Sequence, residues 1–127
     1  MDRQQLILAV DDEPDLRMVI ERILSNSGYR VRVAGGVGEA LTLLDTLEDF
    51  PDLLVTDVRM PDGVGAQLAG LVRRDHPGLP VLYVSGYPED RARAEGLIVD
   101  GFVLEKPFRP VQLSAAVAEA LSSRAAH

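Results

Sequence analysis

Four apolar runs in this chain are each followed directly by polar or charged residues of kinds that bind metal ions or phosphate groups. These residues are Asp11 and Asp12, Asp57, Ser85 and Lys106. If the runs are parallel strands of one sheet, their carboxyl ends open onto a common edge, where open α/β sheets bind their ligands. The spacing therefore predicts one site in which three carboxylates, a hydroxyl and an ammonium group converge.

The aspartates of this set predict a magnesium site. Adjacent carboxylates raise each other's pKa, and a divalent cation removes that cost. Asp12 alone could be a helix cap and Asp57 alone the start of a turn, but their combination with a lysine favours a metal. Mg²⁺ takes oxygen ligands and keeps several waters, which leaves one carboxylate free to react. Asp57 is the candidate nucleophile, because the turn at 60–63 exposes it and carboxylates form acyl phosphates.

Lys106 is the only lysine among thirteen basic residues. A chain that uses arginine elsewhere and keeps one compact ammonium group indicates a chemical role for it. Pro107 ends the preceding strand, can form a cis peptide bond and orients the lysine. Gly86 leaves room for phosphoryl oxygens beside the Ser85 hydroxyl.

Two glycine clusters, at 35–38 and 63–65, invite a dinucleotide interpretation. Both lack the third glycine of that fingerprint, with Leu41 and Leu68 in its place, so we reject it. His76 and His127 have no partner at the spacing of metal ligands.

The composition is that of one soluble domain. The chain has 127 residues, of which 46% are hydrophobic and 26% charged, and no apolar run approaches the roughly 20 residues that span a bilayer. Without cysteine and without the apolar core of a signal peptide, it is expected in the cytoplasm, with no membrane contact of its own. The net charge of −7 and the pI of about 4.7 argue against a nucleic-acid partner.

Short apolar runs alternate with segments of helical period, as in βαβ units around a parallel sheet. The predicted strands are 6–10, 29–34, 53–56, 81–84 and 102–105. The predicted helices are 14–27, 37–47, 64–72, a short and marginal 88–95, and 110–122. The residues expected to face inward are Val111, Val117 and Leu121 in the last helix and Leu16, Val19, Ile20, Ile23 and Leu24 in the first.

These motifs resemble those of a two-component response-regulator receiver domain, and the resemblance covers nearly the whole chain. After the acidic pair, the matching motifs are Asp57 with Met60-Pro61 and Gly65, then Ser85-Gly86, then Lys106-Pro107-Phe108. The resemblance implies a flavodoxin-like α/β fold, a (βα)5 three-layer sandwich with a five-stranded parallel sheet of order 2-1-3-4-5. Residues 1–122 would form the receiver domain and 123–127 a C-terminal tail.

By the same resemblance, Asp57 accepts a phosphoryl group from a phosphohistidine of a partner histidine kinase or phosphotransfer domain. Ser85 and Lys106 would contact the phosphoryl oxygens. The ligands implied for Mg²⁺ are Asp11, Asp12, Asp57 and the backbone carbonyl of Arg59. The domain would not be an enzyme and would signal to a downstream protein target by a conformational change.

Two details refine the resemblance. Residues 81–87 and 104–108 look most like receivers attached to hybrid histidine kinases. Receivers usually carry Tyr or Phe three residues before the lysine, where this chain has Val103. Phe102 is adjacent, but neighbouring strand residues face opposite sides, so it does not replace the missing ring.

Two other functions stay open at this point. A haloacid-dehalogenase-type phosphatase also uses a Mg²⁺-bound aspartate, a Ser or Thr and a lysine. In this chain Arg59 occupies the position of the general acid, and no insert forms a cap over the substrate. The other alternative is a binding module of the same fold that is never phosphorylated.

Overall fold

The computed structural model describes residues 4–125 and contains a five-stranded parallel sheet of order β2-β1-β3-β6-β7. Its strands are β1 (Leu6–Val10), β2 (Arg30–Ala34), β3 (Leu53–Asp57), β6 (Val81–Ser85) and β7 (Phe102–Glu105). The short strands β4 (Arg59–Met60) and β5 (Gly63–Val64) form a separate antiparallel hairpin, so β6 and β7 are the fourth and fifth strands of the main sheet. The predicted order 2-1-3-4-5 is therefore confirmed.

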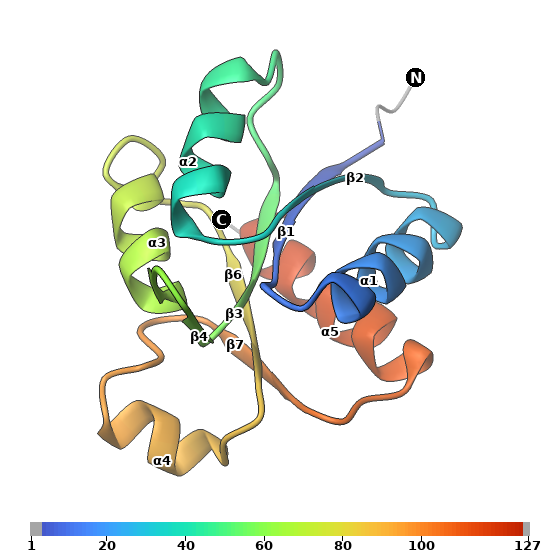
Figure 1. The fold of residues 1–127 in the computed structure, drawn as a ribbon. Coiled ribbons are helices and arrows are strands. Elements are labelled where there is room, and N and C mark those ends of the chain that lie inside the picture. Colours follow the sequence, from blue (N-terminus) through green and yellow to red (C-terminus); the bar gives the residue numbers. More distant parts are fainter. Residues whose placement is uncertain (1–3, 126–127) are drawn as a thin grey trace.

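Helices cover both faces of the sheet, which gives three layers (Figure 1). On one face lie α1 (Pro14–Asn26) and α5 (Pro110–Ala125). On the other lie α2 (Val37–Thr46), α3 (Gly65–Arg73) and α4 (Glu89–Ala94). The flavodoxin-like sandwich expected from the sequence is therefore confirmed.

The central strands contribute side chains to two hydrophobic cores, one on each face of the sheet. All five residues of β1 are buried. Ile7 and Ala9 pack with the buried side chains of α1 and α5, whereas Leu8 and Val10 pack with those of the opposite face. This alternation follows from the two-residue period of a strand, and a sheet buried on both faces needs such continuous apolar strands.

The prediction that Val111 faces inward is wrong. Its side chain is 66% exposed, and the buried residues of α5 are Leu113, Val117, Ala120 and Leu121. Val117 follows Leu113 by four residues, and Ala120 and Leu121 follow Val117 by three and four, so these positions share one helix face. Val111, two residues before Leu113, points away from it. The helix also ends at Ala125 rather than at Ser122.

In α1 the expected stripe is only partly buried. Ile20 and Leu24 are buried, Leu16 and Ile23 are half-buried, and Val19 is 47% exposed. An apolar side of α1 therefore faces outward, toward the start of α5.

The helix α4 is as short as its sequence predicts. Only Ala92 of α4 is buried, so apolar packing contributes little to its position. Polar contacts hold the following loop: the Tyr83 hydroxyl of β6 donates to the Val99 carbonyl (2.8 Å), and the Arg93 guanidinium of α4 donates from Nη2 to the Gly101 carbonyl (3.1 Å). Among the described residues, no helix is long and apolar enough to cross a membrane.

Candidate functional site

The strand ends bring the predicted residues to one edge of the sheet. Asp11 and Asp12 follow β1, and Asp57 ends the neighbouring β3. Ser85 ends β6, and Lys106 follows β7, where its backbone N–H donates to the Ser85 carbonyl at 2.7 Å. The Lys106–Pro107 bond is cis. Parallel pairing therefore assembles residues that are far apart in the sequence.

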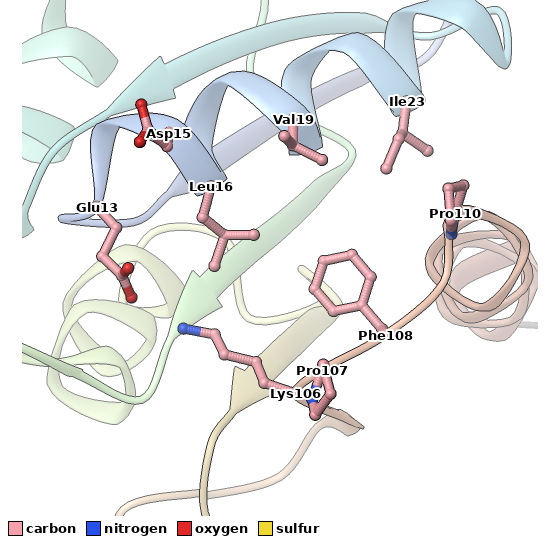
Figure 2. Close-up of a pocket in the computed structure, with 9 residues that line it drawn as sticks. All are labelled: Glu13, Asp15, Leu16, Val19, Ile23, Lys106, Pro107, Phe108 and Pro110. Carbon is pink, nitrogen blue, oxygen red and sulfur yellow. The ribbon is translucent and has the colours of Figure 1, made fainter.

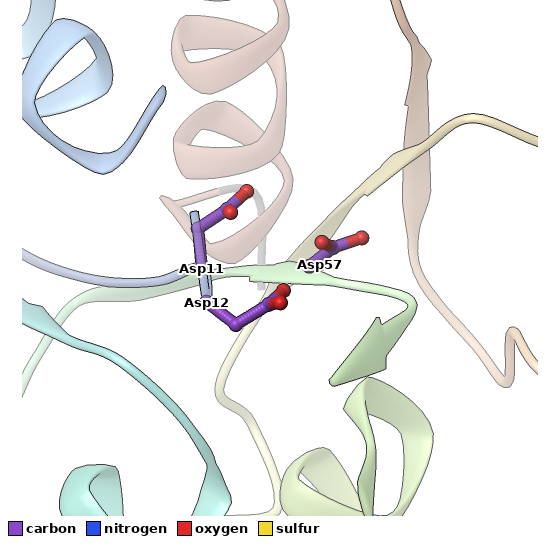
Figure 3. Close-up of side chains that lie close together, drawn as sticks. All are labelled: Asp11, Asp12 and Asp57. Atoms are coloured by element: carbon purple, nitrogen blue, oxygen red, sulfur yellow. The ribbon is translucent and has the colours of Figure 1, made fainter. Parts of the chain in front are cut away.

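Three carboxylates form a compact cluster (Figure 3). One oxygen each of Asp11, Asp12 and Asp57 lies within 4.8 Å of the other two. Asp11 is buried, whereas Asp12 and Asp57 are only partly buried. Three acidic oxygens at this spacing are the donor set that a hard divalent cation prefers.

The Asp11 carboxylate is only half satisfied. Its Oδ1 accepts the backbone N–H of Glu13 at 2.9 Å. Its Oδ2 is the one buried side-chain oxygen or nitrogen atom within residues 4–125 that lacks a hydrogen-bond partner. The Lys106 ammonium lies 3.7 Å from it, close enough for attraction but too far for a hydrogen bond. A buried carboxylate oxygen without a donor fits the binding of a cation at this point.

Asp57 is oriented by two contacts. Its Oδ1 accepts the backbone N–H of Val58 at 2.7 Å, and its Oδ2 lies 3.3 Å from the Lys106 ammonium nitrogen. The carboxylate therefore has a fixed plane, with one oxygen facing the positive charge. The Lys106 ammonium group thus lies near both Asp11 and Asp57.

Burial raises the pKa of Asp57 above its usual value, and the charge of Asp11 raises it further. The Lys106 ammonium opposes this shift but does not cancel it. Burial likewise raises the pKa of Asp11, against the Glu13 N–H and the Lys106 charge. The site therefore destabilises its own negative charge and gains from any added cation.

Ser85 belongs to the same edge, but its hydroxyl is bound elsewhere. The side chain is buried, and its Oγ both donates to the Tyr87 carbonyl (3.1 Å) and accepts the Tyr87 N–H (2.9 Å). The structure thus brings Ser85 to the site without directing its hydroxyl at the carboxylates.

Two tyrosines flank Ser85 in the sequence, and one of them is the cross-strand neighbour of Val103, where the switch ring is missing. Tyr83 pairs with Val103 across the sheet and is fully buried, with its hydroxyl bound to Val99. The Tyr87 ring has the guanidinium carbons of Arg59 and Arg91 at 5.9 and 5.7 Å from its centre, distances typical of cation–π contacts. The Arg59 side chain therefore connects the loop after Asp57 to the loop after Ser85.

An apolar groove of about 480 Å³ opens beside Lys106. Its lining comes from α1 and from the segment between β7 and α5, and is formed by Glu13, Asp15, Leu16, Val19, Ile23, Lys106, Pro107, Phe108 and Pro110 (Figure 2). The lysine head lies at one end, and side chains such as Phe108 and Leu16 face each other across the opening.

Sequence reasoning missed this groove and one supporting contact. Arg17, on α1, donates from Nη1 to the Asp11 carbonyl at 2.8 Å. A positive side chain in the first part of a helix is unfavourable for the helix dipole, and that conflict was the available signal. The groove has no such signal in the sequence, because partly exposed apolar residues cannot be told from core residues by their type.

Comparisons with known proteins show the family of this chain. Residues 7–118 match the response regulator receiver domain. The chain is 40% identical over 121 residues to the sensor kinase CckA of Brucella abortus, a match that covers 93% of this chain and 13% of that protein. It is 38% identical over 125 residues to the response regulator protein PilR of Pseudomonas aeruginosa, and this match covers 98% of this chain and 27% of PilR. The chain thus spans a small part of both relatives.

Solved structures give the same result. A response regulator receiver protein from Sinorhizobium medicae superposes with a TM-score of 0.83 at 32% identity, covering 96% of this chain and 98% of that one. A CheY-like receiver domain protein from Methanospirillum hungatei gives a TM-score of 0.82 at 27% identity, covering 98% of each chain. The chain belongs to the response regulator receiver domain family, a class of phosphoacceptor signalling modules of two-component systems.

The raised pKa of Asp57 predicts a pH-dependent effect of Asp57→Asn on stability. Burial penalises the charged carboxylate, so its folded-state pKa lies above that of the unfolded chain. The favourable contribution of the protonated form is then lost as the pH rises through the folded-state pKa. In metal-free buffer with a chelator, Asp57→Asn should melt at a higher temperature than the wild type at pH 7.

That gain should shrink as the pH falls toward the usual pKa of 3.8, where the native carboxyl is protonated as well. Thermal melts at several pH values measure it. Asp45→Asn, at an exposed position of α2, is the control and should show no such trend. A gain for Asp57→Asn that does not shrink as the pH falls from about 7 to about 4, near the usual range of a carboxyl group, contradicts the prediction.

Proposed function

We propose that Asp57 is the phosphoacceptor of this receiver domain and takes its phosphoryl group from a phosphohistidine of a partner protein. The observation that carries the proposal is the orientation of the Asp57 carboxylate, with one oxygen on the Val58 N–H and the other facing Lys106. The domain acts as a stoichiometric acceptor in signalling, not as a turnover enzyme.

The acidic cluster fits a Mg²⁺ ion. The side chains that would hold it are Asp11, Asp12 and Asp57, with the backbone carbonyl of Arg59 as a further oxygen ligand. The unpartnered Asp11 Oδ2 and the mutual spacing of the three carboxylates support this set. When bound, the ion supplies positive charge that stabilises the phosphoryl oxygens during transfer.

In the transfer step, the N–P bond of the phosphohistidine breaks and a bond forms between the phosphorus and a carboxylate oxygen of Asp57. The donor histidine leaves as an imidazole. In the loose transition state, negative charge spreads over the phosphoryl oxygens. The Lys106 ammonium, already 3.3 Å from the accepting carboxylate, neutralises part of that charge.

After transfer, the Ser85 hydroxyl turns from the Tyr87 backbone to a phosphoryl oxygen. Both bonds to Tyr87 then break, which frees the loop that leads into α4. Because Val103 has no ring to move inward, the loop 86–88 carries the change to α4 and from there to a downstream protein target. The short packing surface of α4, with only Ala92 buried, supports movement of this helix.

The partner docks over the apolar groove beside Lys106. The groove leads directly to the site, and Val19 is exposed on its wall, so an apolar helix face of the partner would bury this surface while presenting its phosphohistidine to Asp57. The similarity to the sensor kinase CckA supports a histidine kinase or phosphotransfer domain as the partner, in line with the hybrid-kinase resemblance of residues 81–87 and 104–108.

Neither alternative function receives support from the relatives. A phosphatase of the haloacid-dehalogenase type needs an acid two residues after the nucleophile, and Arg59 at that position stacks on Tyr87 instead. The boundaries of the domain at 1–122 and of the tail at 123–127, and the cytoplasmic location, stay predictions.

The first test is direct phosphorylation. Acetyl phosphate with Mg²⁺ should add one phosphoryl group to the wild-type chain, because the Asp57 carboxylate lies beside the Lys106 ammonium group and is more accessible than the buried Asp11 carboxylate. Intact mass spectrometry measures the addition. Asp57→Asn should show none, and the same mass increase in that variant would overturn the assignment.

The second test is Lys106→Arg. Arginine keeps the charge but has a wider, planar head, so attraction to the acidic cluster should persist while the contact to the phosphoryl group is misplaced. Phosphorylation by acetyl phosphate should slow by about tenfold or more, a loss of about 1.4 kcal/mol of transition-state stabilisation. Quench-flow sampling with mass spectrometry gives the rate. A rate equal to that of the wild type would mean that Lys106 supplies charge alone.

The third test separates docking from chemistry. Val19→Glu places a charge on the groove wall and should slow phosphotransfer from a histidine kinase that phosphorylates the wild-type chain, by about tenfold, as expected for a buried apolar anchor. The rate with acetyl phosphate should not change, because Val19 does not contact the carboxylates.

The control for the groove is Val99→Glu. Val99 is 55% exposed and lies in the loop after α4, outside the groove. Its substitution should leave kinase-dependent phosphotransfer at the wild-type rate. Equal slowing by both substitutions would contradict docking over the groove.

A further inference from the structure

Asp62 has a carboxylate that belongs to none of the contacts described so far. It lies in the turn of the β4–β5 hairpin and accepts two backbone N–H groups, from Val37 at Oδ1 and from Gly38 at Oδ2, both at 2.9 Å. These bonds, that from Gly38 first, hold the pKa of Asp62 below its usual range. Asp62 is therefore a charged acceptor for two of the free N–H groups at the start of α2.

Asp62, and not the N-cap residue itself, caps the start of α2 with its side chain. Gly36 occupies the N-cap position and makes no side-chain cap bond. A Cβ atom at Gly36 would lie 2.7 Å from Asp62 Oδ1, and its three nearest atoms would all belong to the Asp62 carboxylate. The backbone of Gly36 is fully extended, a conformation open to any residue. Position 36 therefore favours glycine because the Asp62 carboxylate occupies the volume that a Cβ atom would need.

The hairpin tip and α2 make a second contact. Gly63 follows Asp62 with a φ of +151°, which favours glycine, and a Cβ atom there would lie 3.1 Å from the Val37 side chain. The two glycine clusters, which have no place in a dinucleotide fingerprint, thus meet each other around one carboxylate.

The other end of the hairpin is joined to the phosphoacceptor. Gly65 closes its base by donating its N–H to the Val58 carbonyl at 2.9 Å. A Cβ atom at Gly65 would clash with the Asp57 carbonyl oxygen, so the backbone is tightly packed there. The segment from Asp57 to Gly65 is therefore held at its base by β3 and at its tip by Asp62.

We propose that Asp62 is a positioning residue for the phosphorylation site, acting by tying the hairpin to the start of α2. The hairpin begins at Arg59, whose carbonyl is the proposed backbone ligand of Mg²⁺, and Val58 donates to the reacting carboxylate. Fixing the hairpin tip limits the movement of both groups. This inference rests on the proposed function, because it concerns the metal and phosphorylation at Asp57.

The test is a double-mutant cycle with Asp62→Ala, Gly36→Ala and both together. Mg²⁺ binding is followed by NMR through the backbone shifts of Asp12 and Val58, and phosphorylation by acetyl phosphate is measured separately. Each single substitution should weaken Mg²⁺ binding by about threefold or more, near the lower end of the coupling seen between contacting residues. The double variant should be no weaker than either single one, since Gly36→Ala conflicts only with the Asp62 side chain.

Other variants keep the test decisive. Asp62→Asn keeps one acceptor oxygen and should lie between the wild type and Asp62→Ala, and it serves if the alanine variant does not fold. Asp45→Ala, on the same helix α2 and exposed, should bind Mg²⁺ as the wild type does.

Three results would overturn the inference. One is a lower melting temperature of Asp62→Ala and Asp62→Asn with unchanged Mg²⁺ binding and phosphorylation, which would make Asp62 a helix cap only. Another is an additive loss in the double variant. The third is a wild-type chain that neither binds Mg²⁺ nor is phosphorylated, in which case the proposed function fails as well. A functional wild type with an equally functional Asp62→Ala variant defeats this inference alone.

Discussion

The site depends on repulsion among three carboxylates that the fold forces together. Asp11 and Asp57 are fixed by adjacent strands and partly withdrawn from water, and burial raises the pKa of both. One ammonium group, that of Lys106, is shared between them and leaves an excess of negative charge. Because like charges held together are stabilised by a cation, this electrostatic penalty favours the magnesium binding that we propose for the site.

The two faces of the sheet contribute different parts to this edge. The α1–α5 face supplies the groove and Arg17, which holds the Asp11 carbonyl. The opposite face supplies α2, which is bound to the hairpin after Asp57, and α4, which follows the Ser85 loop. In the proposed function, the phosphoryl donor and the downstream target therefore use different surfaces, with the carboxylate cluster between them.

Much of this could be predicted from the sequence, because a strand end is a local feature. An apolar run that stops at Asp57 or Lys106 indicates both the strand and the side chain at its end. Parallel pairing then brings these strand ends to the same edge of the sheet. The orientation of the Ser85 hydroxyl depends on a rotamer choice against Tyr87 and has no sequence signal. The outward position of Val111 shows that an apolar residue near a helix start need not join the buried stripe. The contact of Asp62 with α2 joins positions 24 and 25 residues apart, and only the folded chain reveals it.

The two hydrogen bonds between Ser85 and the backbone of Tyr87 also set a resting balance. A hydroxyl that turns toward a phosphoryl group must first give up both, at a cost of about 1 to 3 kcal/mol if each is of ordinary strength. Under the proposed switch, the signalling arrangement is therefore the less populated state before phosphorylation. The strength of these two bonds would then set the signalling output in the absence of an active kinase. A chain in which they are weaker would adopt the signalling arrangement more often and give a higher output without phosphorylation.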